Sequence, residues 1–249
     1  MSSREDLVFK IKLAEQAERF EDMVSYSNEL IKMGGDLSTD ERNLVSVAFK
    51  NSIGTRRTAW RALVAIEQKD EEKGAKHKDV IGKYKKTVEA ELEKVAKEVI
   101  SILDSHLIKN ATQGEPKIFY LKMKGDYYIY WAESLSSDKQ KEIGAKAAEV
   151  YAAATKEAED ESGKGLPKTN PIRLGLALNY SVFFYEILNE PDKAIKLAKT
   201  AFDGAIQDLD KLEDEVYKES ASIMQLLRDN LTLWTSEKND KEDKNVEDM

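Results

Sequence analysis

The chain has 249 residues, of which 41% are hydrophobic and 35% are charged, with 4 prolines, 12 glycines and no cysteine. This balance is typical of a folded, helix-rich protein, and the lack of cysteine excludes disulfides, thiol catalysis and thiolate metal sites. A net charge of −8 argues against a nucleic-acid partner. No apolar run suits a signal peptide or a membrane span, so we expect no membrane partner and a cytoplasmic location.

Helix-breaking and helix-capping residues divide the chain into about nine predicted helices. Ser38 followed by Glu41 forms a capping-box pattern, as does Ser137 with Gln140, and Asn170 before a proline restarts a helix. Besides a joint near Phe20, the predicted breaks lie at 34–36, 73–74, 110–116, 134–138, 162–167, 189–191 and 208–210. Strand-like alternation is scarce, so the sequence predicts an all-α fold.

Two predicted helices, 39–71 and 76–109, are long enough to span about 50 Å each. Paired antiparallel helices of this length indicate an extended bundle. The last stretch, 236–249, has six acids, three lysines and no aromatic residue, which predicts a disordered acidic tail.

Nothing in the sequence predicts an active site. The two histidines, His77 and His106, lie in no motif for a nucleophile, and no metal-binding or P-loop pattern is present. We therefore expect a protein without catalytic residues, cofactor or metal.

Four cations gather on the third predicted helix: Lys50, Arg56, Arg57 and Arg61. Lys50 and Arg57 are two turns apart on one face, and Arg61 lies one turn further. Such a cluster is repulsive unless acids or anions compensate it. It therefore indicates either internal salt bridges or an anion pocket, in which arginine offers bidentate geometry for phosphate.

Two later stretches combine apolar residues with amides on one face. Asn179, Val182 and Glu186 recur at helical spacing, and a second such set is Ile223, Leu226, Asn230 and Trp234. Buried amides need hydrogen-bond partners, found either within the bundle or on the backbone of a bound segment. Upstream, Gly125 within a predicted helix indicates close packing, and the tyrosines around it fit a core better than a groove lining.

The first predicted helix has two apolar faces, one with Leu7, Ile11 and Ala14 and the other with Phe9, Leu13 and Ala17. Two apolar faces predict either one contact within the chain and one with another chain, or a helix buried on both sides.

Long segments of the chain are similar to one family. They are KLAEQAER (12–19), ERNL (41–44), YLKMKGDYY (120–128), PIRLGLALN (171–179) and MQLLRDNLTLW (224–234). On these segments the chain closely resembles the 14-3-3 family, from about residue 4 to residue 236. The resemblance implies nine antiparallel helices per subunit, in a cup-shaped dimer with an amphipathic groove. It also implies a single domain, 1–235, followed by the acidic tail, 236–249.

The function implied by the resemblance is that of a non-enzymatic adaptor for phosphoserine or phosphothreonine segments of client proteins. Its other partner would be a second 14-3-3 subunit, in a homodimer or a heterodimer. The implied phosphate-binding residues are Lys50, Arg57 and Tyr130. The implied peptide-binding residues are Lys122, Leu178, Asn179, Val182, Glu186, Ile223, Leu226, Asn230 and Trp234. The implied dimer interface contains Leu13, Ala17, Arg19, Ala59, Leu63, Tyr84 and Glu91.

The sequence departs from the family pattern at the phosphate position before Tyr130, where Ile129 replaces an arginine. Other departures are Ser222 on the apolar wall, Trp131, Thr87 in place of the lysine partner of Asp22, and Ala59 in place of a serine. A phosphate site that lacks a bidentate arginine loses about 2–5 kcal/mol, which predicts weakened phosphate affinity. The alternatives are a phosphate-independent peptide binder and a structural subunit that acts mainly by heterodimerisation.

Overall fold

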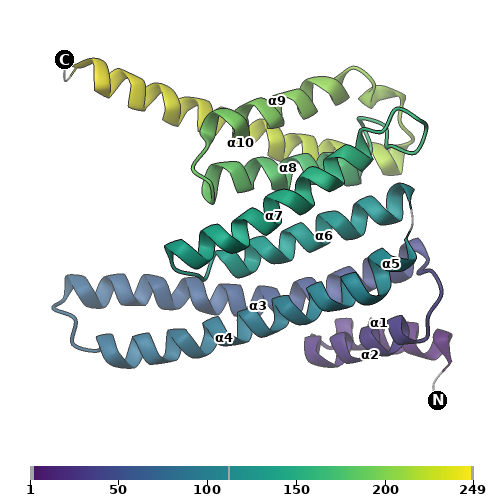
Figure 1. Cartoon of the computed structure of the whole chain (residues 1–249), viewed down its shortest axis with the longest axis horizontal. Helices are drawn as coiled ribbons and strands as arrows, with labels where there is room; N and C mark the ends of the chain where they lie inside the picture. The colour runs from purple at the N-terminus through teal and green to yellow at the C-terminus, as the bar shows by residue number, and fades with distance from the viewer. Residues whose placement is uncertain (1–2, 112, 248–249) are drawn as a thin grey trace. The chain divides into compact units, whose positions relative to one another are not determined.

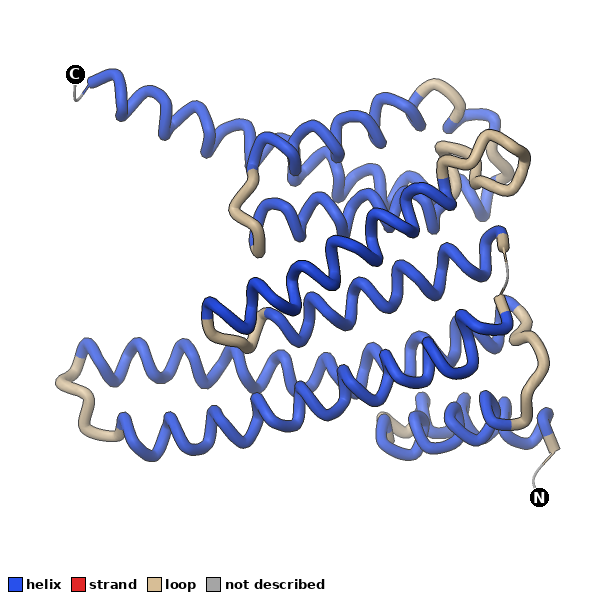
Figure 2. The backbone as a smooth tube through the Cα atoms, viewed as in Figure 1, coloured by secondary structure: helices blue, strands red, loops and turns tan. Residues whose placement is uncertain are grey.

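The computed structural model describes residues 3–111 and 113–247, and all regular elements in that part are helical (Figures 1 and 2). In chain order they are α1 (Arg4–Gln16), α2 (Phe20–Lys32), α3 (Thr39–Glu72), α4 (Lys78–Ile102), the π-helix η1 (Leu103–Leu107), α5 (Ile108–Asn110), α6 (Gly114–Ala132), α7 (Ser137–Ala158), α8 (Pro171–Glu186), α9 (Pro191–Ile206), the 3₁₀ turn η2 (Leu209–Lys211) and α10 (Asp214–Glu247). Since α4, η1 and α5 follow one another directly, the described residues form nine long helices. The predicted all-α class is confirmed.

The helix boundaries follow from the caps that the sequence supplies. Ser38 Oγ accepts a hydrogen bond from the Glu41 amide at 3.2 Å, and the Glu41 carboxylate accepts one from the Ser38 amide at 2.8 Å. Asn170 Oδ1 likewise accepts from the amides of Ile172 and Arg173 at 2.8 and 3.3 Å. Two of the three predicted caps are therefore confirmed, and the side chain of Ser137, on which the third depends, lies outside the described residues.

The chain divides into two compact units, residues 1–112 with 130–143 (unit 1) and residues 113–129 with 144–249 (unit 2). In unit 1, α1 packs on α2 and α3, α2 on α3, and α3 on α4. Helix α1 buries Leu7 and Ile11, whereas Phe9 and Leu13 on its other face are 62% and 53% exposed. Among the described residues, only one apolar face of α1 is covered, so the alternative of a helix buried on both sides is wrong.

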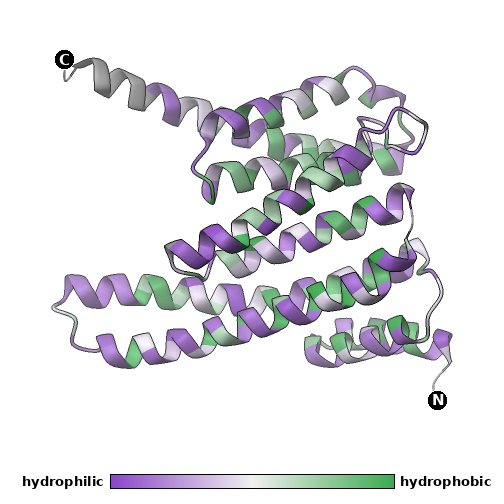
Figure 3. Ribbon diagram, in the orientation of Figure 1, coloured by the Kyte–Doolittle hydropathy of each residue, from purple (hydrophilic) through white to green (hydrophobic). Residues whose placement is uncertain are grey.

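In unit 2, helix α8 packs on both sides, which explains its high content of apolar residues (Figure 3). Leu176 and Phe183 belong to a cluster with residues of α6 and α7, including Ile118, Ile129 and Tyr151. Leu174 belongs to a second cluster with residues of α9 and α10, including Ala198, Met224, Leu227 and Trp234. Helix α8 thus connects the two halves of the apolar core of unit 2.

Helix α10 continues to Glu247, although a disordered tail is expected from residue 236. Side-chain contacts between helices continue at least to residue 238. Glu237 accepts a hydrogen bond from Tyr185, and Lys238 Nζ donates a hydrogen bond to Asp192 Oδ1 at 2.8 Å. Glutamate and lysine also favour helix over coil, which fits a helix that continues past residue 236. Residues 248–249 lie outside the described part.

No described helix has an apolar stretch of the length and hydropathy that crossing a bilayer requires.

Gly125 on α6 lies in the apolar core of unit 2, where close packing leaves no space for a side chain. A Cβ there would lie 2.6 Å from Cε1 of the buried Tyr151. We expect Gly125→Ala to lower the free energy of unfolding by about 1–3 kcal/mol, because overpacking outweighs the gain in helix propensity. Gly82→Ala on α4 is the matched control, since nothing lies within 4 Å of its added methyl group; this change should stabilise the protein by up to about 1 kcal/mol. Urea unfolding of both variants measures the difference, and equal stability of Gly125→Ala and the wild type would contradict this packing.

Candidate functional site

Arg57 on α3 is held in unit 1 by a carboxylate and an aromatic ring. Its Nε and Nη2 donate to the two carboxylate oxygens of Glu133 at 3.0 and 2.7 Å, and its guanidinium lies 4.1 Å from the ring centroid of Tyr130. Arg61 Nη2 lies 3.4 Å from the same carboxylate. The guanidinium of Arg57 is therefore fixed in position by bidentate and cation–π contacts.

The four cations of α3 have different partners. Arg56 lies 3.1 Å from Glu21 and 3.3 Å from Glu91, so it belongs to internal ion pairs. Lys50 is exposed, and among the described residues its ammonium has no hydrogen bond or ion pair. The internal salt bridges of the basic cluster are therefore confirmed in part. The anion pocket stays a prediction.

Glu133 is the residue of this cluster that the sequence did not reveal. It lies just beyond the end of α6, three residues after Tyr130, and its side chain is only 14% exposed. The spacing of three residues places the carboxylate near the tyrosine on one side of the helix. That spacing was the available signal, but it does not identify an arginine on α3 as the partner.

Ile129 is a core residue of unit 2. It is buried and belongs to the apolar cluster of α6, α7 and α8. The neighbouring Trp131 lies in unit 1, where the Lys97 ammonium is 5.1 Å from its ring centroid. The side chain at position 129 therefore contributes apolar packing and offers no hydrogen-bond donor to a phosphate.

A buried carboxylate on α6 organises the polar residues of unit 2. Asp126 accepts hydrogen bonds from Tyr151 Oη at 2.6 Å, from Asn179 Nδ2 at 2.8 Å and from Lys122 Nζ at 2.8 Å. Three donors, one of them charged, compensate the burial of an acid. The network orients Lys122 and Asn179, two of the predicted peptide-binding residues, and one N–H of Asn179 is satisfied within the bundle.

The remaining predicted peptide-binding residues lie on α8 and α10 and differ in exposure. Leu178, Val182 and Ile223 are half-buried against the second apolar cluster. Leu226 and Glu186 are exposed. Among the described residues, the half-buried amide of Asn230 makes no hydrogen bond, so both its donor and its acceptor remain available.

Trp234 is only 4% exposed and is largely a core residue in this conformation. Its ring stacks on that of Tyr185 with centroids 4.7 Å apart. The Tyr185 hydroxyl donates a hydrogen bond to the Glu237 carboxylate, which raises the pKa of Tyr185 to about 12. Together these contacts connect α8 to the C-terminal half of α10.

The residues predicted for a dimer interface lie in unit 1. Leu13, Ala17, Ala59 and Tyr84 are exposed, and Leu63 is half-buried. Arg19 pairs with Asp22 at 2.5 Å, and Glu91 pairs with Arg56. Within one chain, both residues of the predicted intersubunit ion pair therefore have other partners.

The cations of the basic cluster in unit 1 contact carboxylates and an aromatic ring. No group of three or more metal-ligating side chains is present among the described residues. The described part of the chain is all-helical, with a basic cluster in unit 1 and a buried polar network in unit 2. A family model described as 14-3-3 protein matches residues 10–235.

The chain is 53% identical to 14-3-3 protein beta/alpha-1 of Oncorhynchus mykiss, over 94% of each chain. It is 51% identical to 14-3-3 protein 2 of Entamoeba histolytica, over 97% of this chain and all of the relative. It is also 54% identical to Protein BMH1 of Saccharomyces cerevisiae, over 95% of this chain and 88% of the relative. The chain therefore belongs to the 14-3-3 family, whose members are non-enzymatic adaptors.

The contact between Tyr185 and Glu237 has a spectroscopic signature. Because the carboxylate favours the protonated phenol, the folded-state pKa of about 12 lies above the usual value near 10. The stabilisation from this contact is therefore complete below about pH 10 and is lost as the pH rises towards 12. In an absorbance titration at 295 nm, we expect a tyrosine with a midpoint near 12 that disappears in Tyr185→Phe and shifts towards 10 in Glu237→Gln. Identical curves for the wild type and Glu237→Gln would show that the contact does not form.

Proposed function

We propose that this adaptor binds client segments that carry phosphoserine or phosphothreonine, with a phosphate affinity weakened by Ile129. The observation that carries the proposal is the placement of Arg57 by Glu133 and Tyr130. A guanidinium already held in place loses little conformational entropy when a ligand binds. Lys50, Arg57 and Tyr130 are the proposed phosphate contacts.

The charge balance of the cluster supports a weakened site. Lys50, Arg57 and Arg61 carry three positive charges, and Glu133 offsets one of them while holding both arginines. Each charge-assisted hydrogen bond contributes about 1.5–3 kcal/mol. With an apolar side chain at position 129, no guanidinium at that position helps to bind a phosphate dianion.

The proposed peptide contacts are the predicted residues of unit 2. Lys122 and Asn179 are held by Asp126, and Asn230 retains both hydrogen-bonding groups of its amide. Leu178, Val182, Ile223 and Leu226 offer apolar contacts beside them, with Glu186 and Trp234 completing the set. Amides flanked by aliphatic side chains suit an extended segment, whose backbone needs both donors and acceptors.

A second candidate is peptide binding that does not depend on phosphate. Glu133 already supplies one carboxylate that Arg57 and Arg61 share, so part of their charge is compensated without a ligand. The single negative charge of an acidic residue in place of phosphate would then suit the positive charge that remains on Lys50 and the arginines.

We also propose that the chain pairs with a second 14-3-3 subunit through the uncovered faces of α1 and α4. Phe9, Leu13, Val80 and Tyr84 are exposed large apolar residues in these helices. Burial of such residues stabilises an interface far more than exposed ion pairs do. The same faces would serve a homodimer or a heterodimer with a sibling subunit. In the alternative of a purely structural subunit, these faces would be the only ones that bind a partner.

Ile129→Arg tests whether this position sets phosphate dependence. We expect the arginine variant to bind a phosphoserine peptide at least about tenfold more tightly, since one charge-assisted bidentate contact exceeds 1.4 kcal/mol, while the unphosphorylated twin is unaffected. Fluorescence anisotropy with labelled peptides measures both affinities.

Ile129→Met is the control for this experiment, because it keeps an apolar side chain in the core cluster and should leave both affinities unchanged. Thermal melting identifies any loss of folding caused by the buried arginine. Tight and equal phosphate preference in the wild type and in Ile129→Arg would refute the weakened site, and no peptide binding by either would refute the adaptor groove.

Leu13→Glu tests the proposed pairing of subunits. A charge in the centre of an apolar interface should convert the dimer to a monomer, because the carboxylate would be desolvated without a partner. Met33→Glu is the matched control, since Met33 is similarly exposed at the end of α2, outside the proposed interface. Sedimentation velocity should show a dimer for the wild type and the control, and a dimer for all three proteins would contradict this interface.

A further inference from the structure

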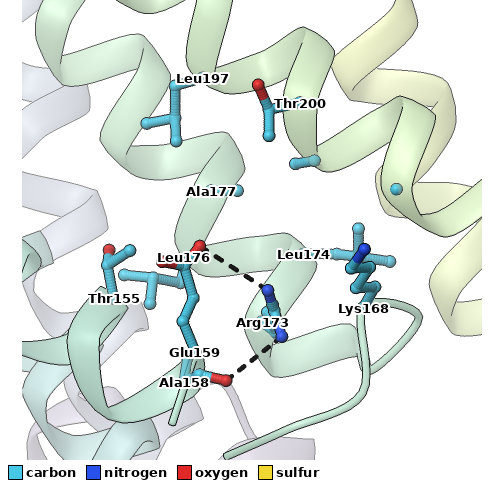
Figure 4. Close-up of a pocket in the computed structure, with 12 residues that line it drawn as sticks. Thr155, Ala158, Glu159, Lys168, Arg173, Leu174, Leu176, Ala177, Leu197 and Thr200 are labelled. Atoms are coloured by element: carbon cyan, nitrogen blue, oxygen red, sulfur yellow. Dashed lines mark hydrogen bonds and ion pairs between the residues drawn. The ribbon is translucent and has the colours of Figure 1, made fainter. Parts of the chain in front are cut away.

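Unit 2 contains a cavity of about 100 Å³ among α7, α8 and α9 (Figure 4). One wall is aliphatic and is formed by Leu174, Leu176, Ala177, Leu197 and Ala201. The other side carries the polar side chains of Thr155, Glu159, Lys168, Arg173 and Thr200. None of these residues belongs to the proposed phosphate, peptide or dimer contacts, so the cavity is a separate feature.

Arg173 lies beside the cavity, and among the described residues its Nη2 has no short hydrogen bond to another side chain. Its Nη1 donates to the backbone carbonyls of Leu166 and Ala158 at 2.7 and 3.3 Å, which fixes the side chain. Its Nη2 lies 3.7 Å from the Glu159 carboxylate, too far for a hydrogen bond. Glu159 is itself 58% exposed, so a ligand carboxylate could replace this weak contact, which Figure 4 shows as a dashed line.

Lys168 supplies a second cation. Its aliphatic stem crosses Gly204, where a Cβ would lie 3.2 Å from Lys168 Cδ. Among the described residues its ammonium has no hydrogen bond or ion pair. It only helps to lower the pKa of Asp208, for which Lys211 is the main cause. The glycine therefore lets the lysine lie along the cavity with its charge unpaired.

The hydroxyl groups around the cavity leave acceptors but no spare donors. Thr155 and Thr200 each donate to the carbonyl one turn back, on Tyr151 and Lys196, both at 2.8 Å. With Lys168 and Arg173 against Glu159, the lining carries a net charge of +1. The donors that remain for a ligand are therefore cationic, and the opposite wall is aliphatic.

We propose that this cavity binds a small organic carboxylate with a short aliphatic body. The carboxylate would accept hydrogen bonds from Arg173 Nη2 and Lys168 Nζ, and the body would lie against the leucine and alanine side chains of α8 and α9. The cavity is smaller than the roughly 300–1,000 Å³ of sites for drug-sized ligands. A cavity of about 150 Å³ holds benzene, so this smaller cavity suits a free acid of no more than about six carbon atoms.

Calorimetric titration of the full chain with hexanoate and with 1-hexanol tests the proposal. We expect hexanoate to bind with a Kd on the order of 1 mM, a value consistent with so few non-hydrogen atoms, and hexanol to bind at least about fivefold more weakly because it lacks the charge. Equal binding of the acid and the alcohol, or no binding of hexanoate, would overturn the proposal.

Two variants locate the binding. Lys168→Gln changes an exposed residue and should weaken hexanoate about five- to tenfold, the loss expected for one charge-assisted hydrogen bond, with hexanol unchanged. Ala201→Leu should fill the cavity and abolish binding of hexanoate, whereas Ala153→Leu, on an exposed position of α7, should not. Melting curves verify that each variant is folded, and unchanged hexanoate affinity in Lys168→Gln would by itself rule out this site.

Discussion

The arrangement of the polar side chains of unit 2 depends on the hydrogen bonds that the buried carboxylate of Asp126 accepts. Asp126 lies on α6 and accepts hydrogen bonds from α7 through Tyr151 and from α8 through Asn179, as well as from Lys122 one turn earlier. A buried acid without such donors would be strongly destabilising. The three donors are therefore held in one arrangement. Tyr151 also lies so close to Gly125 that this arrangement requires glycine at position 125.

A second carboxylate has the same role in unit 1. Glu133 holds Arg57 in bidentate geometry and also approaches Arg61, so that like charges on one face of α3 can coexist. For the proposed phosphate site, this acid would have two opposite effects. It holds the arginine in place, and it lowers the positive charge available to attract a phosphate. Ile129 lies in the apolar core and would add no positive charge to that site.

Much of the fold could be predicted because it depends on local signals. The boundaries of α3 and α8 follow from the caps at Ser38 and Asn170, and the tight contact at Gly125 was indicated by a glycine within a helix. Other features could not be predicted, because they depend on contacts between helices distant in sequence. These include the partner of Arg57, 76 residues away, and the π-helical turn at 103–107. The contacts of Glu237 and Lys238 with Tyr185 and Asp192 likewise could not be predicted from composition.

The sequence by itself determined the helical class, several of the helix boundaries, the resemblance to 14-3-3 proteins and the presence of isoleucine rather than arginine at position 129. These follow from spacing, capping and residue identity, which are properties of the chain alone. Only the tertiary structure decided which cations are compensated, which amides are satisfied, which face of α1 remains uncovered, and that Arg173 and Lys168 lie beside one cavity. Charge compensation and burial depend on distances between elements, and a sequence does not specify those distances until the helices have packed.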